Sequence, residues 1–382
     1  MMERNVRSMT ESRARGPHGV VVTYSTRDNE GDHEARTREA VAAKLATVQQ
    51  FEFGGPYDPA TRYATNVYFV PSDTLTGVKA AAKLGIRSEH DLFGGVVPHA
   101  FAATKTITHP LVDKHARAPL GWSPDFAAQV DGAVLRGYTV FSRDDAHRAL
   151  ARLLDHGPAR IKLARGIGGH GQFVIQEAAE LDELLASIDD AELGSAGVVL
   201  EEHLDQVTTH SVGQVRVAGI IASYWGTQRM TRNNRGHEVY GGSDLLVVRG
   251  GFDALRASPL STDAQLAVSR ALVYDSAADA SFAGFFASRR NYDVVEGTDA
   301  RGRRRAGVLE QSWRIGGASA AEVEALLAFR GDSTLSAVRA STVEVYGEPP
   351  SLADQAVVFY SGVDPHVGPI THYVTLEPYG DL

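Results

Sequence analysis

In the segment RIKLARGIGGHGQ (Arg160–Gln172), a run of glycines lies between two apolar stretches, RIKLA before the glycines and QFVI after them. Both flanks have the length and apolar character of strands, so the glycines are expected to join two strands. A Walker phosphate loop or a dinucleotide fingerprint instead runs from a strand directly into a helix, whose N-terminus then faces phosphate. The segment therefore matches neither of those two nucleotide-binding patterns.

The segments around the glycines alternate between strand and helix patterns. Ser142 is a good N-cap with Asp145 three residues later, and the helix that follows ends near Gly157–Pro158. A second helix pattern covers Ala178–Ala191. The expected strands are Tyr138–Phe141, Arg160–Ala164, Gln172–Ile175 and Gly197–Glu202. The order is therefore strand, helix, strand, glycine loop, strand, helix, strand, and this order is more informative than the glycines alone.

The lysine and the glycines of this segment together suggest a phosphate site. Lys162 lies inside an apolar strand, where an unpaired ammonium group is costly, and a phosphate within its reach removes that cost. Glycines leave backbone N–H groups uncovered, so such a loop can fold over a polyphosphate. The glycines concerned are Gly166, Gly168, Gly169 and Gly171. The alternative is a flexible hairpin with a solvent-facing lysine; lysine, loop and strand order together favour the phosphate site.

The segment Asn291–Arg314 contains two apolar strand patterns, NYDVVEG and AGVLEQSWR, joined by the polar connector TDARGRRR. If the strands pair antiparallel with Val295 opposite Val308, then Asp293 lies opposite Glu310. Cross-strand neighbours have Cβ atoms about 5 Å apart, so the two carboxylates would share one face and repel each other. Mg²⁺ suits such a place, because it prefers a few carboxylates together with phosphate oxygens and water.

Side chains alternate along the second of these strands, which puts Glu310, Ser312 and Arg314 on one side and Gln311 and Trp313 on the other. Arg314 thus adds a fixed cation near the carboxylates, able to hold a phosphoryl or carboxylate group at two points. The alternative for the whole segment is an ordinary exposed hairpin with a surface Arg–Glu pair.

Two further segments suggest ligand contacts. In VVLEEHLDQ (Val198–Gln206), a buried strand emerges into consecutive acids and then Leu204, a combination that can offer adenine an apolar slot and hydrogen-bond acceptors. The alternative is a strand that ends in a capped turn. The polar stretch Gly226–Gly242 carries several basic residues, and it either receives an anionic substrate or forms a solvated loop.

Composition narrows the classes of function. The chain has 382 residues, a formal net charge of −9, 43% hydrophobic and 22% charged residues, which is ordinary for a globular enzyme. The negative charge argues against nucleic-acid binding as the main activity. The absence of cysteine excludes disulfides, thiolate metal sites and cysteine nucleophiles. Neither a membrane-spanning run nor a secretory signal is present, so we expect a cytoplasmic protein without a membrane partner.

The chain divides into four expected parts. Residues 1–18 are polar and are expected to form a flexible tail, and residues 19–100 alternate strand and helix patterns typical of a small α/β layer. Residues 101–340 form the main domain, with a first half to about 200 and a second half from about 201. Residues 341–382 have strand patterns that predict either a β-rich C-terminal extension or a homodimer contact.

With these segments in this order, the chain from about Lys105 to Gly317 resembles the ATP-grasp superfamily. That fold clamps ATP between two α+β subdomains behind a smaller α/β domain, which residues 20–100 resemble. The resemblance implies phosphate contacts from Lys105 and Lys162, a phosphate-covering loop at Gly166–Gly171, an adenine hinge at Glu201, Glu202 and Leu204, and metal ligands at Asp293, Glu310 and Ser312. The spacing E-x-S-x-R resembles the E-x-N-x-R of the biotin carboxylase branch, which implies a catalytic role for Arg314.

The chain departs from the family pattern at two places. Ser312 replaces the usual asparagine; a hydroxyl can ligate Mg²⁺ but is shorter. The acid that the family often uses for ribose is absent, with Thr208 and Thr209 near its place. The stretch VLEQSWRIGGAS also resembles an uncharacterised bacterial group within or beside the superfamily.

The resemblance implies an ADP-forming ligase that uses ATP and Mg²⁺ or Mn²⁺. A small-molecule carboxylate would attack the γ-phosphate to give an acyl phosphate, and a nucleophile such as an amine would then displace phosphate. Three alternatives stay open: a small-molecule kinase on the same fold, an ATP-binding regulatory protein without chemistry, and a glycine-rich interaction domain without nucleotide affinity. The sequence identifies neither the acid nor the nucleophile.

Overall fold

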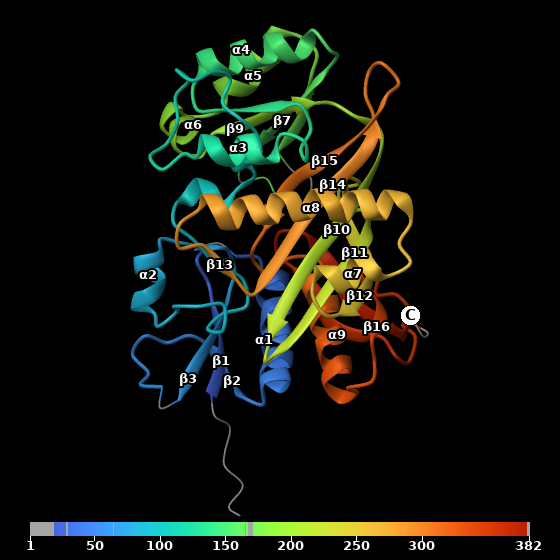
Figure 1. Ribbon diagram of the computed structural model, residues 1–382. Coiled ribbons are helices and arrows are strands. Elements are labelled where there is room, and N and C mark those ends of the chain that lie inside the picture. Colours follow the sequence, from blue (N-terminus) through green and yellow to red (C-terminus); the bar gives the residue numbers. More distant parts are fainter. Residues whose placement is uncertain (1–18, 28–29, 64, 165, 167–170, 380–382) are drawn as a thin grey trace, which may run out of the picture.

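The computed structural model describes residues 19–27, 30–63, 65–164, 166 and 171–379. Figure 1 shows a four-stranded sheet with its helices at the top, the long helix α8 (Thr262–Ser281) across the middle, and the N-terminal strands beside α1 (Asp32–Gln49) at the bottom. The tail expected at residues 1–18 lies outside the described residues. The chain is a mixture of α/β and α+β parts, as predicted.

The N-terminal part is a parallel sheet in the order β2-β1-β3. Parallel neighbours need a crossover connection, and helix α1 (Asp32–Gln49) supplies it between β1 and β2. The strands are β1 (Gly19–Tyr24), β2 (Glu52–Pro56) and β3 (Asn66–Pro71). The carboxyl ends of β1 and β3 lie side by side, because Tyr24 pairs with Pro71. The loops that leave these two strands therefore begin at the same edge.

A second, smaller sheet connects the first third of the chain to the last third. Its order is β13-β5-β4, and its strands are β4 (Leu75–Thr76), β5 (Gly95–Val97) and β13 (Phe286–Ala287). The short helix α2 (Val78–Lys83) lies between β4 and β5 in sequence, and two 3₁₀ turns follow, η1 (Ala100–Ala103) and η2 (Lys105–Ile107). The pairing of β5 with β13 brings the turns next to the strand that starts at Arg289.

The four-stranded sheet contains the glycine segment and is antiparallel in the order β6-β9-β7-β8. Ser142 caps the first helix by accepting a hydrogen bond from the Asp145 amide. The strands are β6 (Gly137–Val140), β7 (Ala159–Leu163), β8 (Gln172–Ile175) and β9 (Val198–Glu202), and the helices are α4 (Arg143–Leu154), α5 (Ala178–Ala186) and α6 (Asp190–Ala196). Helix α3 (Pro124–Val130) precedes this sheet in sequence and packs against α8 instead. The predicted order of elements is confirmed, with the second predicted helix divided into α5 and α6.

The largest sheet has eight antiparallel strands in the order β15-β14-β10-β11-β12-β16-β18-β17. Its strands are β10 (Asp205–Val217), β11 (Ile220–Arg232), β12 (Glu238–Arg249), β14 (Arg289–Thr298), β15 (Arg304–Ser312), β16 (Ala337–Tyr346), β17 (Val357–Asp364) and β18 (Gly368–Pro378). Its helices are α7 (Phe252–Ala257), α8 (Thr262–Ser281) and α9 (Ser319–Gly331). The boundary expected near residue 340 falls within β16, and the division of the chain into domains stays a prediction.

The pairing of β14 with β15 has the predicted Asp293–Glu310 neighbours, but the predicted Val295–Val308 pair was wrong. Val308 lies opposite Val294 instead, because the register shifts by one residue between Asp293 and Val294. Leu309 is the additional residue of this β-bulge. It packs against the small apolar cluster that contains Leu135 and Leu204. The bulge therefore adds one apolar side chain to that cluster while Asp293 and Glu310 remain opposite each other.

The large sheet is buried on both faces by different helices. Leu245 and Val247 of β12 pack in the cluster that contains α1 and α9, whereas Leu246 and Val248 pack in the cluster that contains α8. Tyr292 belongs to the α8 cluster, and strand residues alternate between faces. The side chains on either side of Tyr292 therefore point to the face opposite α8.

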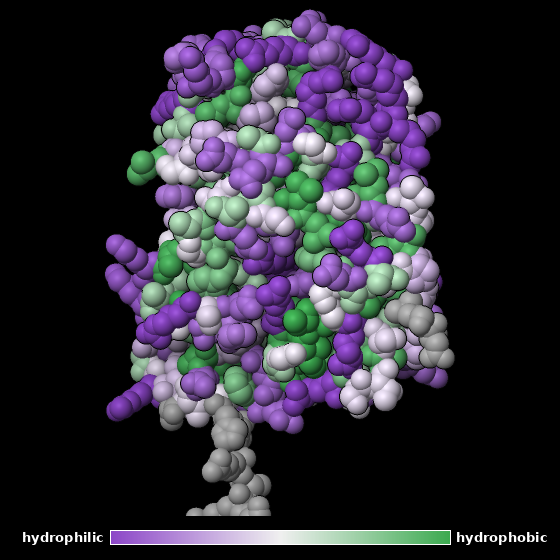
Figure 2. Space-filling model, viewed as in Figure 1, coloured by the Kyte–Doolittle hydropathy of each residue, from purple (hydrophilic) through white to green (hydrophobic). Residues whose placement is uncertain are grey.

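In Figure 2 hydrophilic residues gather over the top of the molecule, where α4 and α5 lie, and hydrophobic residues are more frequent toward its middle. Within the described ranges, no helix is long and apolar enough to cross a membrane.

Candidate functional site

The two predicted metal carboxylates meet on the face of the large sheet opposite α8. Asp293 and Glu310 are cross-strand neighbours in β14 and β15. Burial and the neighbouring Glu310 carboxylate raise the pKa of Asp293 to about 6. The structure thus places two acids close enough to repel each other, which is the arrangement expected at a cation site.

Asp293 is held by three uncharged donors. Its Oδ1 accepts hydrogen bonds from Gln228 Nε2 at 2.9 Å, Asn291 Nδ2 at 3.0 Å and Ser211 Oγ at 3.4 Å. Gln228 also donates to Ser211 Oγ at 3.0 Å. These contacts fix the carboxylate group in position without neutralising its charge.

Lys105 connects the 3₁₀ turn η2 to Glu310. The Lys105 side chain is only 4% exposed, and its Nζ lies 2.8 Å from Glu310 Oε2. It also donates to the carbonyl oxygen of Gly166 at 3.0 Å. Although burial favours the protonated carboxyl, Lys105 holds the pKa of Glu310 below its usual value. Lys105 therefore links the start of the glycine loop to the carboxylate face.

Lys162 lies in β7 and is part of a buried, charged cluster with Glu201 of β9. Its Nζ is 2.5 Å from Glu201 Oε1, and both side chains are almost fully buried. The other oxygen, Oε2, lies 3.0 Å from His109 Nε2. Burial lowers the pKa of Lys162. Burial also disfavours the charged form of Glu201, but Lys162 and His109 hold the pKa of that carboxyl at about 2.

Ser312 lies on the same face as the carboxylates, opposite Asn291 in the register. Its Oγ lies 3.3 Å from Arg289 Nη1, which donates a hydrogen bond to it. Arg289 is fully buried and pairs with Glu322 of α9, with Nη2 2.8 Å from Oε1. The hydroxyl expected to ligate a metal therefore already accepts a hydrogen bond from a cation.

Arg314 extends the site toward the N-terminal sheet. Its Nε lies 4.0 Å from Asp73 Oδ1, and Asp73 accepts two bonds from Arg27, at 2.7 Å and 2.6 Å. Burial and the charge of Arg27 lower the pKa of Arg314. Arg27 and Asp73 follow β1 and β3, whose carboxyl ends are adjacent. Three elements far apart in sequence thus form a charged edge next to the carboxylates.

The expected adenine segment is engaged mostly by protein partners. The Glu202 carboxylate accepts two hydrogen bonds from Arg305, at 3.0 Å and 2.8 Å, and one from the backbone N–H of Arg136 at 3.1 Å. Leu204 is buried beside Leu135 and Val295. Both side chains therefore stabilise the junction between the two larger sheets, and their predicted contact with adenine stays a prediction.

The glycine loop is described only at its two ends. The backbone N–H of Leu163 donates to the carbonyl oxygen of Gly171 at 2.9 Å, and Gly171 has a φ of 71°. That left-handed conformation favours glycine at the residue directly before β8. Gly166 lies at the other end, against Lys105. Gly168 and Gly169, also predicted to contact phosphate, lie outside the described residues.

The donor set fits a divalent cation such as Mg²⁺ or Mn²⁺. Among the described residues, no group of three or more His, Asp or Glu side chains could hold a metal ion by itself. Mg²⁺ usually binds through one or two carboxylates and completes its shell with phosphate oxygens and water. Asp293 and Glu310 provide such a pair. These residues therefore fit a divalent cation whose remaining ligands would be phosphate oxygens and water.

Residues 21–374 match the family described as "Protein of unknown function (DUF3182)". The chain belongs to this family. A search of the curated proteins finds no match. The family description assigns no activity.

Solved structures with the same fold include three enzymes. A phosphoribosylamine–glycine ligase from Thermotoga maritima is 14% identical, with a TM-score of 0.52, and the match covers 94% of this chain and 92% of the ligase. A D-alanyl-alanine synthetase A from Vibrio cholerae is 10% identical, with a TM-score of 0.50 over 78% and 89% of the two chains. At such identities the likeness concerns the fold alone.

The third is the biotin carboxylase domain of a 2-oxoglutarate carboxylase from Hydrogenobacter thermophilus, solved with MgADP, ADP and bicarbonate. It is 12% identical, with a TM-score of 0.50, and the match covers 96% of this chain and 87% of that domain. The DUF3182 protein therefore has the ATP-grasp fold, and the predicted fold is confirmed.

Several polar residues of this DUF3182 site escaped the sequence analysis. Asn291 was detectable, because strand alternation puts it on the same face as Asp293. His109 follows Lys105 by four residues, but nothing in the sequence indicated that it would meet Glu201. Gln228 lies in the polar stretch Gly226–Gly242, which turned out to be the paired ends of β11 and β12 rather than a loop. Its partner could be identified only from the tertiary structure.

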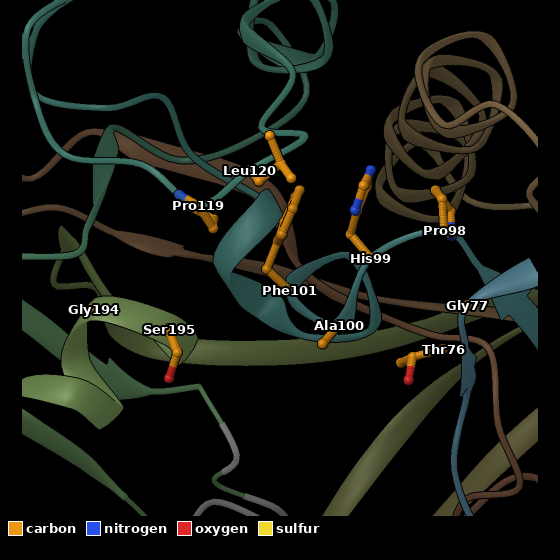
Figure 3. A pocket seen from close by; sticks show the side chains of 10 residues that line it. All are labelled: Thr76, Gly77, Pro98, His99, Ala100, Phe101, Pro119, Leu120, Gly194 and Ser195. Carbon is orange, nitrogen blue, oxygen red and sulfur yellow. The ribbon is translucent and has the colours of Figure 1, made fainter. Parts of the chain in front are cut away.

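A separate pocket of about 560 Å³ lies between the N-terminal part and helix α6 (Figure 3). His99 stacks on Phe101 there, with ring centroids 5.5 Å apart, and Leu120 is 93% exposed. Figure 3 shows these side chains and Ser195 around the pocket. None of the candidate residues that the structure describes lines it. The pocket is therefore distinct from the carboxylate face.

Proposed function

We propose that this DUF3182 protein is an ATP- and Mg²⁺-dependent ligase that activates a small carboxylate as an acyl phosphate. One observation supports the proposal most: two buried lysines from different elements, Lys105 and Lys162, converge with Glu310 and Asp293. The charge of Glu310 acts on Lys162, and Lys105 contacts Glu310 directly. Buried lysines next to a repelling carboxylate pair suit a site that binds metal and polyphosphate together.

Each residue has a separate role in the proposal. Lys105 and Lys162 would exchange their carboxylate partners for phosphate oxygens of ATP. Mg²⁺ held by Asp293 and Glu310 would neutralise charge on the transferred phosphoryl group. Arg314 is half-buried at the edge that faces Arg27 and Asp73, and it would hold the substrate carboxylate at two points. Positioning and charge neutralisation supply most of the catalysis in such a transfer.

The proposed reaction has two steps. In the first, a substrate carboxylate oxygen forms a bond to the γ-phosphorus while the bond to the β–γ bridging oxygen breaks, releasing ADP. In the second, the lone pair of an amine attacks the acyl carbon, the acyl–oxygen bond breaks, inorganic phosphate leaves, and the amine loses a proton to solvent. The products are ADP, phosphate and an amide.

The test is ADP release by the full chain with pools of candidate carboxylic acids and amines. Glu310→Ala should lower turnover by about a hundredfold or more, because the variant removes a charge needed at the transferring group. Glu377→Ala is the matched control, since Glu377 is an exposed carboxylate on β18 of the same sheet. Unchanged turnover in Glu310→Ala contradicts the assignment.

The products separate the proposal from its rivals. ADP formed without inorganic phosphate and without dependence on an amine indicates a kinase on the same fold. Nucleotide binding without any product indicates a regulatory protein. Absence of nucleotide binding excludes the ligase, the kinase and the nucleotide-binding regulatory protein together.

A further inference from the structure

Asn291 is placed to do more than support Asp293. It is two residues before Asp293 on β14, on the same face, and directly opposite Ser312 of β15. Its side chain is 6% exposed. The asparagine amide that the ATP-grasp pattern leads one to expect at position 312 is therefore absent there but present on the neighbouring strand.

The hydroxyl of Tyr224 has more acceptors than it has protons. It lies 2.9 Å from Asn291 Oδ1 and 2.6 Å from Glu322 Oε1, and both contacts require the hydroxyl to donate. A phenol has a single proton to donate. Glu322 is a carboxylate that can only accept, and its contact is the shorter and the charge-assisted one. The proton therefore goes to Glu322, and toward Asn291 the phenol oxygen can only accept.

This assignment determines the orientation of the Asn291 amide. To satisfy Tyr224, the amide must turn its NH₂ group to the phenol oxygen and its carbonyl oxygen to Asp293. The nitrogen and oxygen of an amide are distinguished only by their hydrogen-bond network, so both orientations occupy the same space. After the turn, an amide oxygen and a carboxylate oxygen face each other at the 3.0 Å that now separates Asn291 Nδ2 from Asp293 Oδ1.

Two oxygens that face each other without a proton between them need a cation. Adjacent ligands of octahedral Mg²⁺, with bonds of 2.0–2.1 Å, are about 3.0 Å apart. The separation at Asn291 and Asp293 matches that value. Ser312 is a poorer ligand, because its Oγ accepts a hydrogen bond from the positively charged Arg289 guanidinium at 3.3 Å, which would repel a cation bound to the same oxygen.

Gly213 leaves room for the contact between Asn291 and the Tyr224 hydroxyl. Gly213 of β10 lies between its partners Asn291 on β14 and Tyr224 on β11. A Cβ at Gly213 would lie 2.3 Å from the Tyr224 hydroxyl. The hydroxyl can therefore cross over Gly213 and reach Asn291 only because this residue has no side chain.

We propose that Asn291, not Ser312, supplies the amide-oxygen ligand that completes the divalent-cation site with Asp293 and Glu310. Without the cation the amide can satisfy only one of its two neighbours: it donates to Asp293, and its oxygen faces the Tyr224 oxygen. With the cation it turns, ligates, and donates to Tyr224, which in turn donates to Glu322. The inference rests on the proposed Mg²⁺–ATP site and specifies its ligand set.

Mn²⁺ binding to the full chain, measured from the loss of the free-ion EPR signal in the presence of a non-hydrolysable ATP analogue, tests this. Wild type should bind, Asn291→Ala should weaken binding at least tenfold, and Ser312→Ala should change it less than threefold. Failure of wild type to bind overturns the proposed function as well. Binding by wild type that is lost in Ser312→Ala but kept in Asn291→Ala overturns the ligand assignment alone.

A second measurement distinguishes ligation from simple support of Asp293. The chain has no cysteine, so Asn291→Cys introduces its only thiol, and a thiolate ligand selects soft metals. Asn291→Cys should gain Cd²⁺ binding, seen as thiolate-to-Cd²⁺ absorption, and should prefer Cd²⁺ to Mn²⁺ at least tenfold. Ser312→Cys is the matched control and should gain neither property. Cd²⁺ absorption in Ser312→Cys but not in Asn291→Cys contradicts the inference.

Discussion

Lys162 and Glu201 form a closed ion pair of 2.5 Å between strands of the four-stranded sheet, and His109 binds the remaining carboxylate oxygen. Asp293 and Glu310, on the eight-stranded sheet, are instead two like charges side by side; Glu310 contacts Lys105, whereas Asp293 accepts hydrogen bonds from uncharged side chains. Glu201 is held ionised with a pKa of about 2, whereas the pKa of Asp293 is raised to about 6. In the first region the opposite charges balance each other without a ligand. In the second region a bound cation would reduce the repulsion between the two carboxylates.

The difference predicts which region contributes more to the stability of the free protein and which gains more from a bound cation. A completed buried pair destabilises the fold strongly when one partner is removed, because the other remains buried and charged. A pair of carboxylates that repel each other lowers the stability of the free protein, and a bound cation restores that stability. The following three experiments compare the two regions, in order of decreasing expected effect.

Glu201→Ala should lower the free energy of unfolding by about 3 to 5 kcal/mol, because it leaves Lys162 buried without a counter-charge. Urea denaturation followed by circular dichroism measures the loss. Arg304→Ala, which breaks the exposed pair with Asp263, is the control and should cost about 1 kcal/mol or less. A loss below 1 kcal/mol for Glu201→Ala would show that the closed pair is not a main source of stability.

The stability of the two regions should respond to pH in opposite directions. The folded pKa of Asp293 is about 6 and the unfolded value 3.8, so the folded chain binds more protons between these values. Asp293 therefore lowers stability as pH rises from 3.8 to 6, on the order of 1 to 2 kcal/mol after solvent screening. The pKa of Glu201 is about 2 against 4.5 unfolded, so its contribution is lost as pH falls from 4.5 to 2.

Asp293→Asn isolates the first of these contributions. The difference in unfolding free energy between this variant and wild type should grow from pH 4 to pH 6 and then stay constant. Added Mg²⁺ with nucleotide should reduce the difference, because the cation stabilises only the ionised wild-type site. A difference that is independent of pH would mean that Asp293 titrates normally.

Gln228→Leu should have the smallest effect, about 1 kcal/mol of unfolding free energy. Gln228 donates to Asp293 and so favours its ionised form; without it the pKa of Asp293 should rise further. The pH at which the stability difference between Asp293→Asn and its parent stops growing should then be higher in a Gln228→Leu background. Gln214→Leu removes an amide bonded to Ser223 on the same sheet and should leave that pH unchanged.

Local regularities made parts of this protein predictable. The β-α-β order around Lys162 follows from apolar runs and a Ser142 cap, which act over a few residues. The Asp293–Glu310 pair follows from strand alternation, which has a period of two residues. The Leu309 bulge shifted the valines, yet the two acids stayed opposite each other.

Contacts between distant segments were not predictable in the same way. Arg314 meets Asp73 across more than two hundred residues of chain, and Gly213 admits Tyr224 to Asn291 only through the order of three strands. Such contacts depend on which strands become neighbours. That choice is made by packing of the whole sheet between α8 on one side and α1 and α9 on the other.

The sequence by itself therefore determined the order of elements around Lys162 and the face that Asp293 and Glu310 share, because backbone periodicity is local. Only the tertiary structure decided which charges would be paired and which would be left to repel. The energy of a buried charge depends on every neighbour that the fold brings within a few ångströms of it, and those neighbours come from the entire chain.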